Sequence, residues 1–520
     1  MKMYRIITGF LFLGILFSFS IGQQNQYIEG HPEEKELPFD NNNDGRQLAK
    51  VYCGMCHLFP EPSLLDKKTW VSGVLPNMGL RLGIRDPAAD PYADLVPEEK
   101  DIIRQLNIYP DKPLLTKTQW DKIVKYYMDA APEKLLLIKS DTIYAGTRFK
   151  TNLVYVGDAQ YPKTTLLEFD TLSRSLYLGD AQNMLYVMND RLEFKSAWFT
   201  ESAPVDIDFP LNHPPRLLTI GTFNPSDQKK GRLLSFDTVG GFQAESLINI
   251  DQLTRPVQFA TADLNMDGAE DVVICGFGNN RGELAWYESY DPLKKHVLKA
   301  LPGARKVEIK DMDRDGKPDI IALMAQAWEE IVIFYNQGNG KFREEMVLQF
   351  PPLFGVSFFE LADFNDDGHP DILLSNGDNW DYSPIEKNYH GVRIFENNGR
   401  NKFTEKYFFP LMGASRAVAR DFDLDGDLDI AAIAMYSKEQ LPEHNFVYLE
   451  NINNARYQPF YFPEAASGKW LTMEVADLDQ DGDVDIVLGS YIHTVVEATQ
   501  LMSVGITNFP QLLVLRNQSK

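Results

Sequence analysis

The sequence predicts a chain of two parts: a small all-α domain at residues 41–132 and an all-β domain at residues 140–520. The first observation is that apolar residues recur at helical spacing in the first part and in short, strand-like runs in the second. The second is an acidic nonapeptide that recurs five times in the all-β part, with starts 48 to 58 residues apart. The third is a C-x-x-C-H sequence in the all-α part.

The composition excludes two broad classes of protein. The 520 residues include 51 Lys and Arg against 74 Asp and Glu, which gives a formal net charge of −23. Because phosphate backbones bind basic surfaces, an acid excess of this size argues against nucleic acid as a partner. Three Cys residues are too few for a disulfide scaffold. A fold with 35 Gly and 30 Pro therefore needs another way to hold its many turns.

The N-terminus has the pattern of a secretory signal at residues 1–22, followed by a polar linker at residues 23–40. Lys2 and Arg5 precede an apolar run, and the run ends at a small-x-small cleavage pattern. The run is shorter than the roughly 20 residues that cross a bilayer, and an uncleaved anchor is the alternative. No later segment has the pattern of a membrane span. We therefore expect a periplasmic or secreted protein with no integral span after cleavage.

Three helices are predicted in the all-α domain. The first begins at Gly45 and ends at Cys53, the second includes residues 70–74, and Thr116 is suited to cap the third. The third helix has the clearest helical spacing and stops before Pro132; its periodic residues are Trp120, Ile123, Val124, Tyr127 and Met128.

The acidic nonapeptide marks the repeats of the all-β domain. It reads D-x-[DN]-x-D-G-x-x-D and runs directly into an apolar strand, at residues 263–271, 311–319, 363–371, 421–429 and 477–485. Two weaker copies begin at Asp208 and near Asp170, so the units number seven. A period of this length with several strands per unit indicates a seven-bladed β-propeller. The last unit lacks one strand, and we expect residues 141–156 to supply it and close the ring.

The nonapeptides have the oxygen-rich pattern of calcium loops. Alternate acidic positions direct oxygens inward, position 7 offers a carbonyl, and Gly permits the sharp turn. Position 12 holds strand residues in every copy, which excludes an EF-hand. The alternative is a solvated acidic turn without metal. We predict up to five structural Ca²⁺ ions with ligands from Asp263, Asn265, Asp267, Asp271, Asp311, Asp313, Asp315, Asp319, Asp363, Asn365, Asp367, Asp371, Asp421, Asp423, Asp425, Asp429, Asp477, Asp479, Asp481 and Asp485.

These repeats resemble the FG-GAP or VCBS repeats of the integrin α-subunit propeller and of secreted bacterial proteins. The resemblance covers roughly residues 140–520 and implies a propeller with calcium in its loops. It does not extend calcium to the two degenerate units at Asp208 and Asp170, which lack the Asp-Gly centre.

The segment Cys53–His57 reads C-G-M-C-H, the attachment sequence of haem c. Two thiols can add to the vinyl groups of one haem, and the adjacent His57 can bind the iron. A disulfide leaves the His unexplained, a thioredoxin-like site needs an adjoining βαβ unit, and a zinc site needs further soft ligands nearby. Residues 41–132 resemble a class I-like cytochrome c domain with a single haem. We predict Met78, in a compact loop with Pro76 and Gly79, as the sixth ligand, with Met128 as the competitor.

The propeller offers weaker leads. Cations stand at or near the starts of the predicted innermost strands and could attract an anionic ligand, or could pair with neighbouring acids; they are Arg255, Arg305, Lys306, Arg416 and Lys469. The loop 377–390 contains Asn379, Trp380, Tyr382 and His390 and could bind a sugar or a protein, or be an ordinary surface loop. Cys275 reads as a buried, inert thiol.

These features favour an exported c-type cytochrome that carries electrons to or from an unknown redox partner, with the propeller as a docking scaffold. One alternative is a propeller dehydrogenase that passes substrate electrons to the haem. Another is an adhesion or glycan-binding protein. We identify no catalytic residues in the sequence.

Overall fold

The computed structural model describes residues 45–85, 90–93, 95–138, 142–156, 161–211, 213–236, 248–378, 383–435, 441–453 and 456–520. All of them belong to one compact unit, Asn43–Lys520. The predicted signal and linker, residues 1–22 and 23–40, lie outside the described residues. Within the part that is described, no helix is both long and apolar enough to span a membrane.

The first part of the described chain is helical, and the three predicted helices are confirmed. Thr116 caps the longest helix through a capping box with Gln119. The sequence analysis missed one further helix, although Pro97 at its first turn is a recognised start signal. The helices are α1 (Gly45–Cys53), α2 (Lys67–Thr69), α3 (Leu75–Arg81), α4 (Pro97–Gln105) and α5 (Lys117–Ala130), with a π-helical turn at Trp70–Val74 and a 3₁₀ turn at Pro62–Leu64.

The helices pack around aromatic side chains that also satisfy loop carbonyls. The Trp70 indole donates to the Pro62 carbonyl at 2.8 Å, and the Tyr127 hydroxyl donates to Pro60 at 2.8 Å. The rings of Trp70 and Tyr127 lie 4.4 Å apart. The loop that follows the C-x-x-C-H sequence is therefore fixed to the core from two sides.

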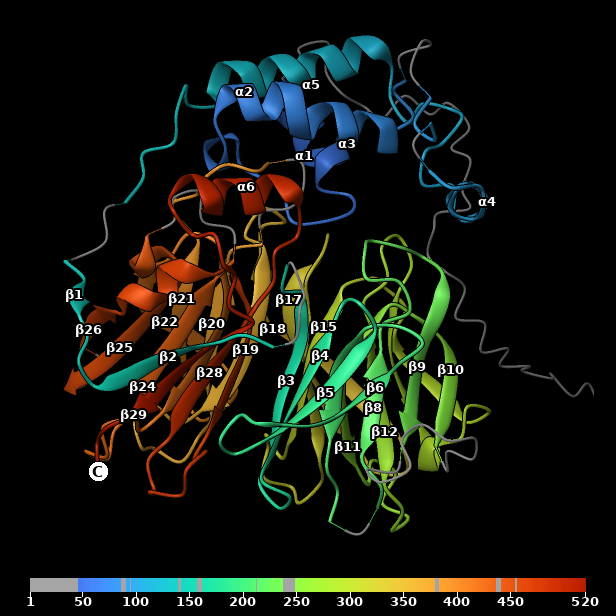
Figure 1. Ribbon diagram of the computed structural model, residues 1–520. Coiled ribbons are helices and arrows are strands. Elements are labelled where there is room, and N and C mark those ends of the chain that lie inside the picture. The colour runs from blue at the N-terminus through green and yellow to red at the C-terminus, as the bar shows by residue number, and fades with distance from the viewer. Residues whose placement is uncertain are drawn as a thin grey trace, which may run out of the picture. The chain divides into compact units, whose positions relative to one another are not determined.

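Seven sheets of mostly four antiparallel strands form the rest of the unit, which confirms the predicted seven-bladed propeller (Figure 1). The first four blades contain β3 (Thr164–Asp170), β4 (Ser175–Asp180), β5 (Met184–Asn189) and β6 (Phe194–Phe199); β7 (Pro204–Asp208), β8 (Arg216–Thr219), β9 (Lys229–Ser235) and β10 (Asn249–Thr254); β11 (Pro256–Ala262), β12 (Asp271–Gly276), β13 (Glu283–Tyr287) and β14 (Lys295–Lys299); and β15 (Ala304–Lys310), β16 (Asp319–Met324), β17 (Glu329–Asn336) and β18 (Phe342–Phe350).

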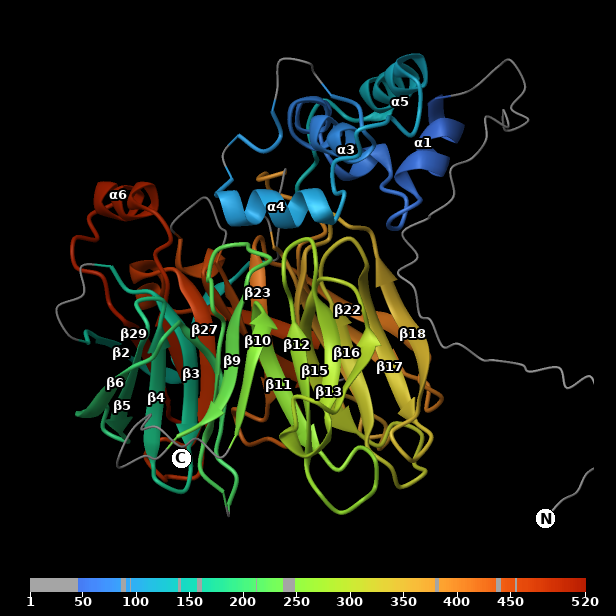
Figure 2. The ribbon, with the colours of Figure 1, turned by 90° about the vertical axis from the view of Figure 1, so that its right-hand side faces the viewer.

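The remaining blades contain the ring closure. Helix α6 lies between β28 and β29 in the chain, beyond one end of the strands of the last blade (Figure 1, Figure 2). The elements are β19 (Val356–Ala362), β20 (Asp371–Asn376), β21 (Gly391–Asn397) and β22 (Phe403–Pro410); β23 (Ala414–Arg420), β24 (Asp429–Ala434), β25 (Phe446–Asn453), β26 (Arg456–Tyr461) and the short β1 (Tyr144–Ala145); and β27 (Trp470–Ala476), β28 (Asp485–Ser490), β29 (Leu512–Asn517), β2 (Phe149–Val154) and α6 (Val495–Ser503).

The strand β2 closes the ring, as the sequence predicted for residues 141–156. It pairs antiparallel with β29, from Phe149 opposite Asn517 to Val154 opposite Leu512. The outermost strand of the last blade thus comes from the start of the propeller sequence, which leaves this blade no missing strand. The sequence analysis did not foresee β1, which pairs in parallel with β26 of the neighbouring blade.

Polar side chains on the innermost strands link blades 2 to 6 in succession. The Asp206 carboxylate on β7 accepts a hydrogen bond from Phe259 N–H on β11 at 2.8 Å. The Glu360 carboxylate on β19 accepts from Ala419 N–H on β23 at 2.7 Å. Gln258 and Glu308 make equivalent bonds to Val307 and Leu361. These acceptors satisfy backbone groups of the inner strands that have no partner in their own sheet.

Polar contacts join the helical part to the propeller, and two of them involve buried or half-buried side chains. On α4, the buried carboxylate of Glu99 accepts hydrogen bonds from the Ser226 hydroxyl and from Asp227 N–H, which lie before β9. In the loop before β21, the Tyr389 hydroxyl donates to the Leu64 carbonyl at 3.2 Å. These bonds connect the helical part to segments of blades 2 and 5.

The ring closure yields a stability prediction. Phe149 on β2 is 5% exposed and its ring contacts those of Phe422, Tyr448 and Phe462. We expect Phe149→Ala to lower the free energy of unfolding by about 3–5 kcal/mol, because it opens a cavity at the closure. Denaturant unfolding followed by tryptophan fluorescence measures the change. Phe194→Ala, at a ring that is 65% exposed, is the control and should cost less than about 0.5 kcal/mol; equal effects would contradict a special role for β2.

Candidate functional site

The five acidic loops share one backbone conformation. Position 4 of every loop has a positive φ between 56° and 66°, although none of these residues is Gly. The Gly at position 6 has a φ between 79° and 101° in every loop. Two left-handed residues so close together turn the chain back on itself, which brings alternate side chains to the inside of the loop.

The carboxylate at position 1 closes each loop through backbone hydrogen bonds. In the loop 421–429, Oδ2 of Asp421 accepts from Gly426 N–H at 3.1 Å and Oδ1 accepts from Asp425 N–H at 3.1 Å. The bond from the Gly N–H recurs in all five loops, at 2.7–3.2 Å. The loop geometry thus follows from the Asp at position 1 and the Gly at position 6.

Positions 1, 3 and 5 bring carboxylates together. In three loops, oxygens of all three aspartates lie within 4.8 Å of one another; the trios are Asp311, Asp313 and Asp315; Asp421, Asp423 and Asp425; and Asp477, Asp479 and Asp481. The other two loops have Asn at position 3, an uncharged oxygen ligand of the same reach. Carboxylates at this separation repel one another unless a cation lies between them, and hard oxygen donors suit Ca²⁺. These donors fit the predicted calcium ions.

The structure shows a different bonding role for the aspartates at position 9. They are at most 1% exposed, and both oxygens accept hydrogen bonds from within the blade. Oδ2 of Asp319 accepts from Met312 N–H at 2.8 Å, and Oδ1 accepts from Asn336 N–H at 2.7 Å. Asp271, Asp371 and Asp485 repeat this pattern, and Asp429 bonds Asn451 N–H and the Tyr448 hydroxyl. We call these five aspartates the clamp aspartates, because each joins its loop to the third strand or the turn after it.

The clamp role was missed by the sequence analysis, which assigned position 9 to the ion. The available signal was that position 9 is also the first residue of a fully buried strand. Burial raises the pKa of each clamp carboxylate, and it raises that of Asp429 to about 7. Their place in the calcium site stays a prediction.

The two degenerate units replace the acidic cluster with an arginine. Arg216 occupies position 9 of the copy that begins at Asp208, and its guanidinium pairs with Asp208 at 2.7 Å and also with Glu270. In the other copy, Arg174 pairs with Asp190 at 3.0 Å. In the unit that begins at Asp208, a side-chain cation therefore compensates the loop carboxylate, whereas Arg174 pairs with an aspartate of the neighbouring β5–β6 turn.

The C-x-x-C-H sequence lies where α1 ends. Cys53 is half-buried in the helical core, and burial raises the pKa of its thiol to about 12. Burial also raises the pKa of Cys56, although this residue is exposed at the surface. A reactive dithiol needs a lowered thiol pKa. The environment of both cysteines therefore disfavours a thioredoxin-like redox site.

The imidazole of His57 is oriented by a backbone carbonyl. Its Nδ1 lies 2.9 Å from the Leu58 carbonyl oxygen, a geometry in which Nδ1 carries the proton and donates. Burial lowers the pKa of His57, so the ring is neutral at pH 7. Nε2 then has the lone pair that a metal ion requires.

The two methionine candidates differ in position. Met78 packs, half-buried, against the helical core that also contacts Cys53, whereas Met128 on α5 is 42% exposed. The sequence analysis placed Met78 in a compact loop, and this is wrong: it lies in helix α3. Pro76 stands directly after the π-helical turn Trp70–Val74, where the Leu75 N–H already bonds the Trp70 carbonyl five residues back and the regular α-helical pattern is interrupted. Position 79 is a glycine because a Cβ there would come within 3.0 Å of the Trp120 ring.

The cations near the starts of the innermost strands make contacts within the propeller. Arg305 pairs with Asp378 at 3.4 Å, Lys306 pairs with Glu308, and Arg255 donates to the carbonyls of Phe223 and Gly278. Arg416 lies over the Phe358 ring, and burial lowers the pKa of Lys469 to about 8.

The loop 377–390 is described only in part. Asn379, Trp380 and Tyr382 lie outside the described residues. From residue 383 onward the loop faces the helical part: Ile385 packs against the helical core, and Asn388 donates to the Leu136 carbonyl at 3.1 Å. His390 is fully buried, so it does not belong to an open binding surface. Cys275 is also fully buried, and burial raises the pKa of its thiol.

The comparison with protein families identifies the repeats. A family model described as an FG-GAP-like repeat matches residues 263–322, 311–374 and 421–488, and these segments contain all five acidic loops. The chain therefore carries FG-GAP-like repeats. It is also similar to the Neurospora crassa Pan2 WD40 domain, with 12% identity over 67% of this chain and 95% of that chain and a TM-score of 0.41. A chain in the complex of an S. cerevisiae Dbp5 variant with Nup159, a Gle1 variant, IP6 and ADP matches with 10% identity, 73% and 98% coverage and a TM-score of 0.40.

The loop geometry yields a prediction that separates the two kinds of aspartate. We expect Asp371→Ala to lower the free energy of unfolding by about 3 kcal/mol with or without calcium, because it leaves the buried N–H of Asn397 and the half-buried N–H of Phe364 unbonded. Asp367→Ala, at an exposed position of the same loop, should cost less than about 1 kcal/mol in chelator. In calcium it should also reduce the rise in melting temperature that the bound ion produces by mass action. Thermal unfolding in calcium and in EGTA measures both effects. If calcium raised the melting temperature of Asp367→Ala as much as that of the wild type, the result would contradict an ion site at this loop.

Proposed function

We propose that this chain is an exported c-type cytochrome that carries electrons through one covalent haem c, with the propeller as a docking scaffold for a redox partner protein. The observation that carries the proposal is the C-x-x-C-H sequence at the end of α1, with His57 oriented by a carbonyl and Met78 packed against the same core as Cys53. Cys53 and Cys56 would form the thioethers, and His57 and Met78 would bind the iron.

The surroundings of the motif support this assignment. Met55 and Leu58, on either side of Cys56 and His57, expose 44% and 40% of their surface. Apolar side chains next to a metal-ligating histidine are of the kind that a bound porphyrin would cover. Haem held this way supplies one-electron transfer, and Met/His ligation raises its reduction potential relative to His/His ligation.

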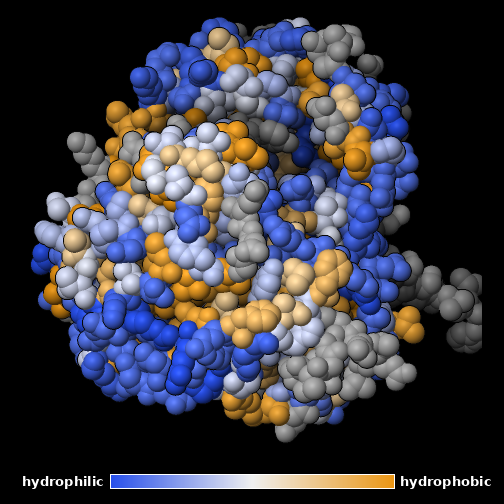
Figure 3. All heavy atoms as spheres, in the orientation of Figure 1, coloured by the Kyte–Doolittle hydropathy of each residue, from blue (hydrophilic) through white to orange (hydrophobic). Residues whose placement is uncertain are grey.

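The propeller supports the scaffold role. FG-GAP-like repeats and a closed seven-bladed ring provide a rigid body, and up to five calcium ions would hold its loops. Glu99 and Tyr389 fix the helical part to this body, so a partner that docks on the propeller would meet the haem domain in a constant orientation. Figure 3 shows hydrophilic residues gathered at the end of blades 6 and 7 where β24 and β28 begin, which is the end that carries the acidic loops.

Export is part of the proposal. The secretory pattern of residues 1–22 would deliver the chain to the compartment where haem c is attached. The same compartment is outside the reducing cytoplasm. The thiols of Cys53 and Cys56 are the groups that attachment would consume.

The haem assignment has a direct test. We expect Cys53→Ala combined with Cys56→Ala to abolish covalent haem in a host that can ligate it, since no thiol remains at the motif. Haem staining after denaturing electrophoresis detects the covalent product. Cys275→Ala is the matched control and should retain full staining. A stained band in the double variant, or a colourless wild-type protein, would refute the assignment.

The sixth ligand can be tested separately. We expect Met78→Ala to remove the thioether-to-iron charge-transfer band of ferric haem and to lower the reduction potential, because the iron loses its Met ligand. Absorption spectra and a redox titration of the purified holoprotein measure both changes. Met128→Ala, at the exposed competitor on α5, should change neither. If only Met128→Ala removes the band, the assignment to Met78 is wrong.

A further inference from the structure

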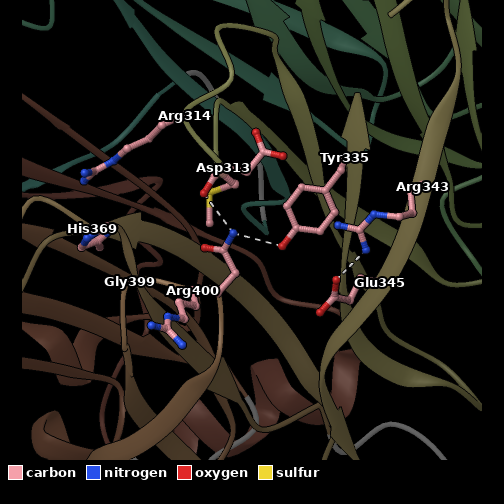
Figure 4. A pocket seen from close by; sticks show the side chains of 10 residues that line it. Asp313, Arg314, Tyr335, Arg343, Glu345, His369, Gly399 and Arg400 are labelled. Atoms are coloured by element: carbon pink, nitrogen blue, oxygen red, sulfur yellow. Dashed lines mark hydrogen bonds and ion pairs between the residues drawn. The ribbon is translucent and has the colours of Figure 1, made fainter. Parts of the chain in front are cut away.

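A pocket opens between blades 4 and 5, beside two of the acidic loops. Its volume is about 270 Å³, and it is lined mainly by cationic and polar side chains: Arg314, Arg343, Arg400, His369, Tyr335 and Asn401. Figure 4 shows Arg314 and His369 on one side of the open space and Tyr335 and Arg343 on the other. The sequence analysis did not single out any of these six residues.

One side of the pocket is built by the acidic loops themselves. Arg314 is position 4 of the loop 311–319, has a φ of 62°, and donates to the Gly368 carbonyl of the next loop at 2.6 Å. His369 is position 7 of that next loop, and its ring lies so close to Gly399 that a Cβ there would come within 2.9 Å of Nε2. Any ion that orders these loops would therefore also order this side of the pocket.

The other side is held by contacts among its own residues. The Arg343 guanidinium lies 4.2 Å from the centre of the Tyr335 ring and pairs with Glu345 at 2.7 Å. Lys402 also pairs with Glu345 at 2.7 Å, so two cations compensate this one carboxylate. The Tyr335 hydroxyl accepts from the Asn401 amide at 3.0 Å. Because Arg343 lies over the Tyr335 ring, that face of the ring is not available for a neutral sugar to stack on.

The charge of the pocket depends on the neighbouring loop. Three arginines face two carboxylates, Asp313 and Glu345, in a protein whose formal net charge is −23. Asp313 belongs to the trio with Asp311 and Asp315, whose oxygens point at the predicted ion site. Calcium at that site would compensate Asp313 and leave the arginines as the dominant charge in the pocket.

We propose that this pocket binds an oxyanion, either a free ion or the charged group of an acidic saccharide, and that bound calcium strengthens the binding. The planar guanidinium groups of Arg314 and Arg400 match carboxylate and sulfate oxygens, and the volume suits one small group and its immediate neighbours. The calcium dependence rests on the proposed calcium loading of the loops; the oxyanion site itself does not.

The test is isothermal titration of the full-length protein with sulfate, methyl glucuronide and methyl glucoside, in calcium and in EGTA. We expect both anions, or one of them, to bind in calcium and the neutral glucoside not to bind. Tighter binding of sulfate than of the glucuronide would identify a free oxyanion as the ligand, and the reverse order an acidic saccharide. Arg314→Gln and Arg400→Gln should each weaken binding about tenfold. Arg191→Gln, in the equivalent hairpin of blade 1, is the matched control and should have no effect.

Three results would overturn the proposal or its calcium dependence. Absence of anion binding, or equal binding of the neutral glucoside, overturns the oxyanion site. Unchanged affinity in both arginine variants places the binding elsewhere and also overturns it. Equal anion affinity in calcium and in EGTA overturns the calcium dependence. The melting temperature, measured in parallel, shows whether calcium was loaded, and haem staining shows whether the cytochrome proposal stands independently.

Discussion

The five blades that carry an acidic loop depend on one interaction, the pair of hydrogen bonds that each clamp aspartate accepts. One oxygen binds a backbone N–H of the acidic loop in four of the five copies, and the other binds the third strand of the blade or the turn after it. The carboxylate is buried. If these hydrogen bonds were broken, its charge would have no donor and the two N–H groups would have no acceptor. The clamp therefore fixes each loop, whose own shape is closed by the Asp at position 1, to the blade behind it.

This constraint places the other features of the loop. With position 9 held inside the blade, positions 1, 3 and 5 are left at the surface, where their oxygens converge. The convergence is unfavourable unless a positive charge compensates it, and the degenerate unit with Arg216 shows how a side chain can do so. In the intact loops the corresponding cation would be calcium. The side chain at position 4 can then contact a neighbouring loop. Arg314 does so, by reaching the next loop and lining the pocket between the blades.

The helical part and the propeller are joined by contacts that no repeat supplies. Glu99 on α4 and the loop before β21 meet backbone groups of the opposite part, and Ile385 joins the helical core. The long loop that the sequence analysis considered as a binding surface therefore serves, in its described part, as a junction.

The sequence by itself determined the elements that depend on local pattern. These are the seven blades, the closing strand β2, the capped helix α5, the acidic nonapeptide and the C-x-x-C-H sequence. All of them follow from periodicity or from residues close together in the sequence. Only the tertiary structure decided what depends on distant contacts. It put Met78 in a helix, turned the aspartates at position 9 into clamps, and brought Arg314 and Arg400 together from loops more than 80 residues apart. These outcomes arise from burial and from packing between blades, which a linear pattern does not encode.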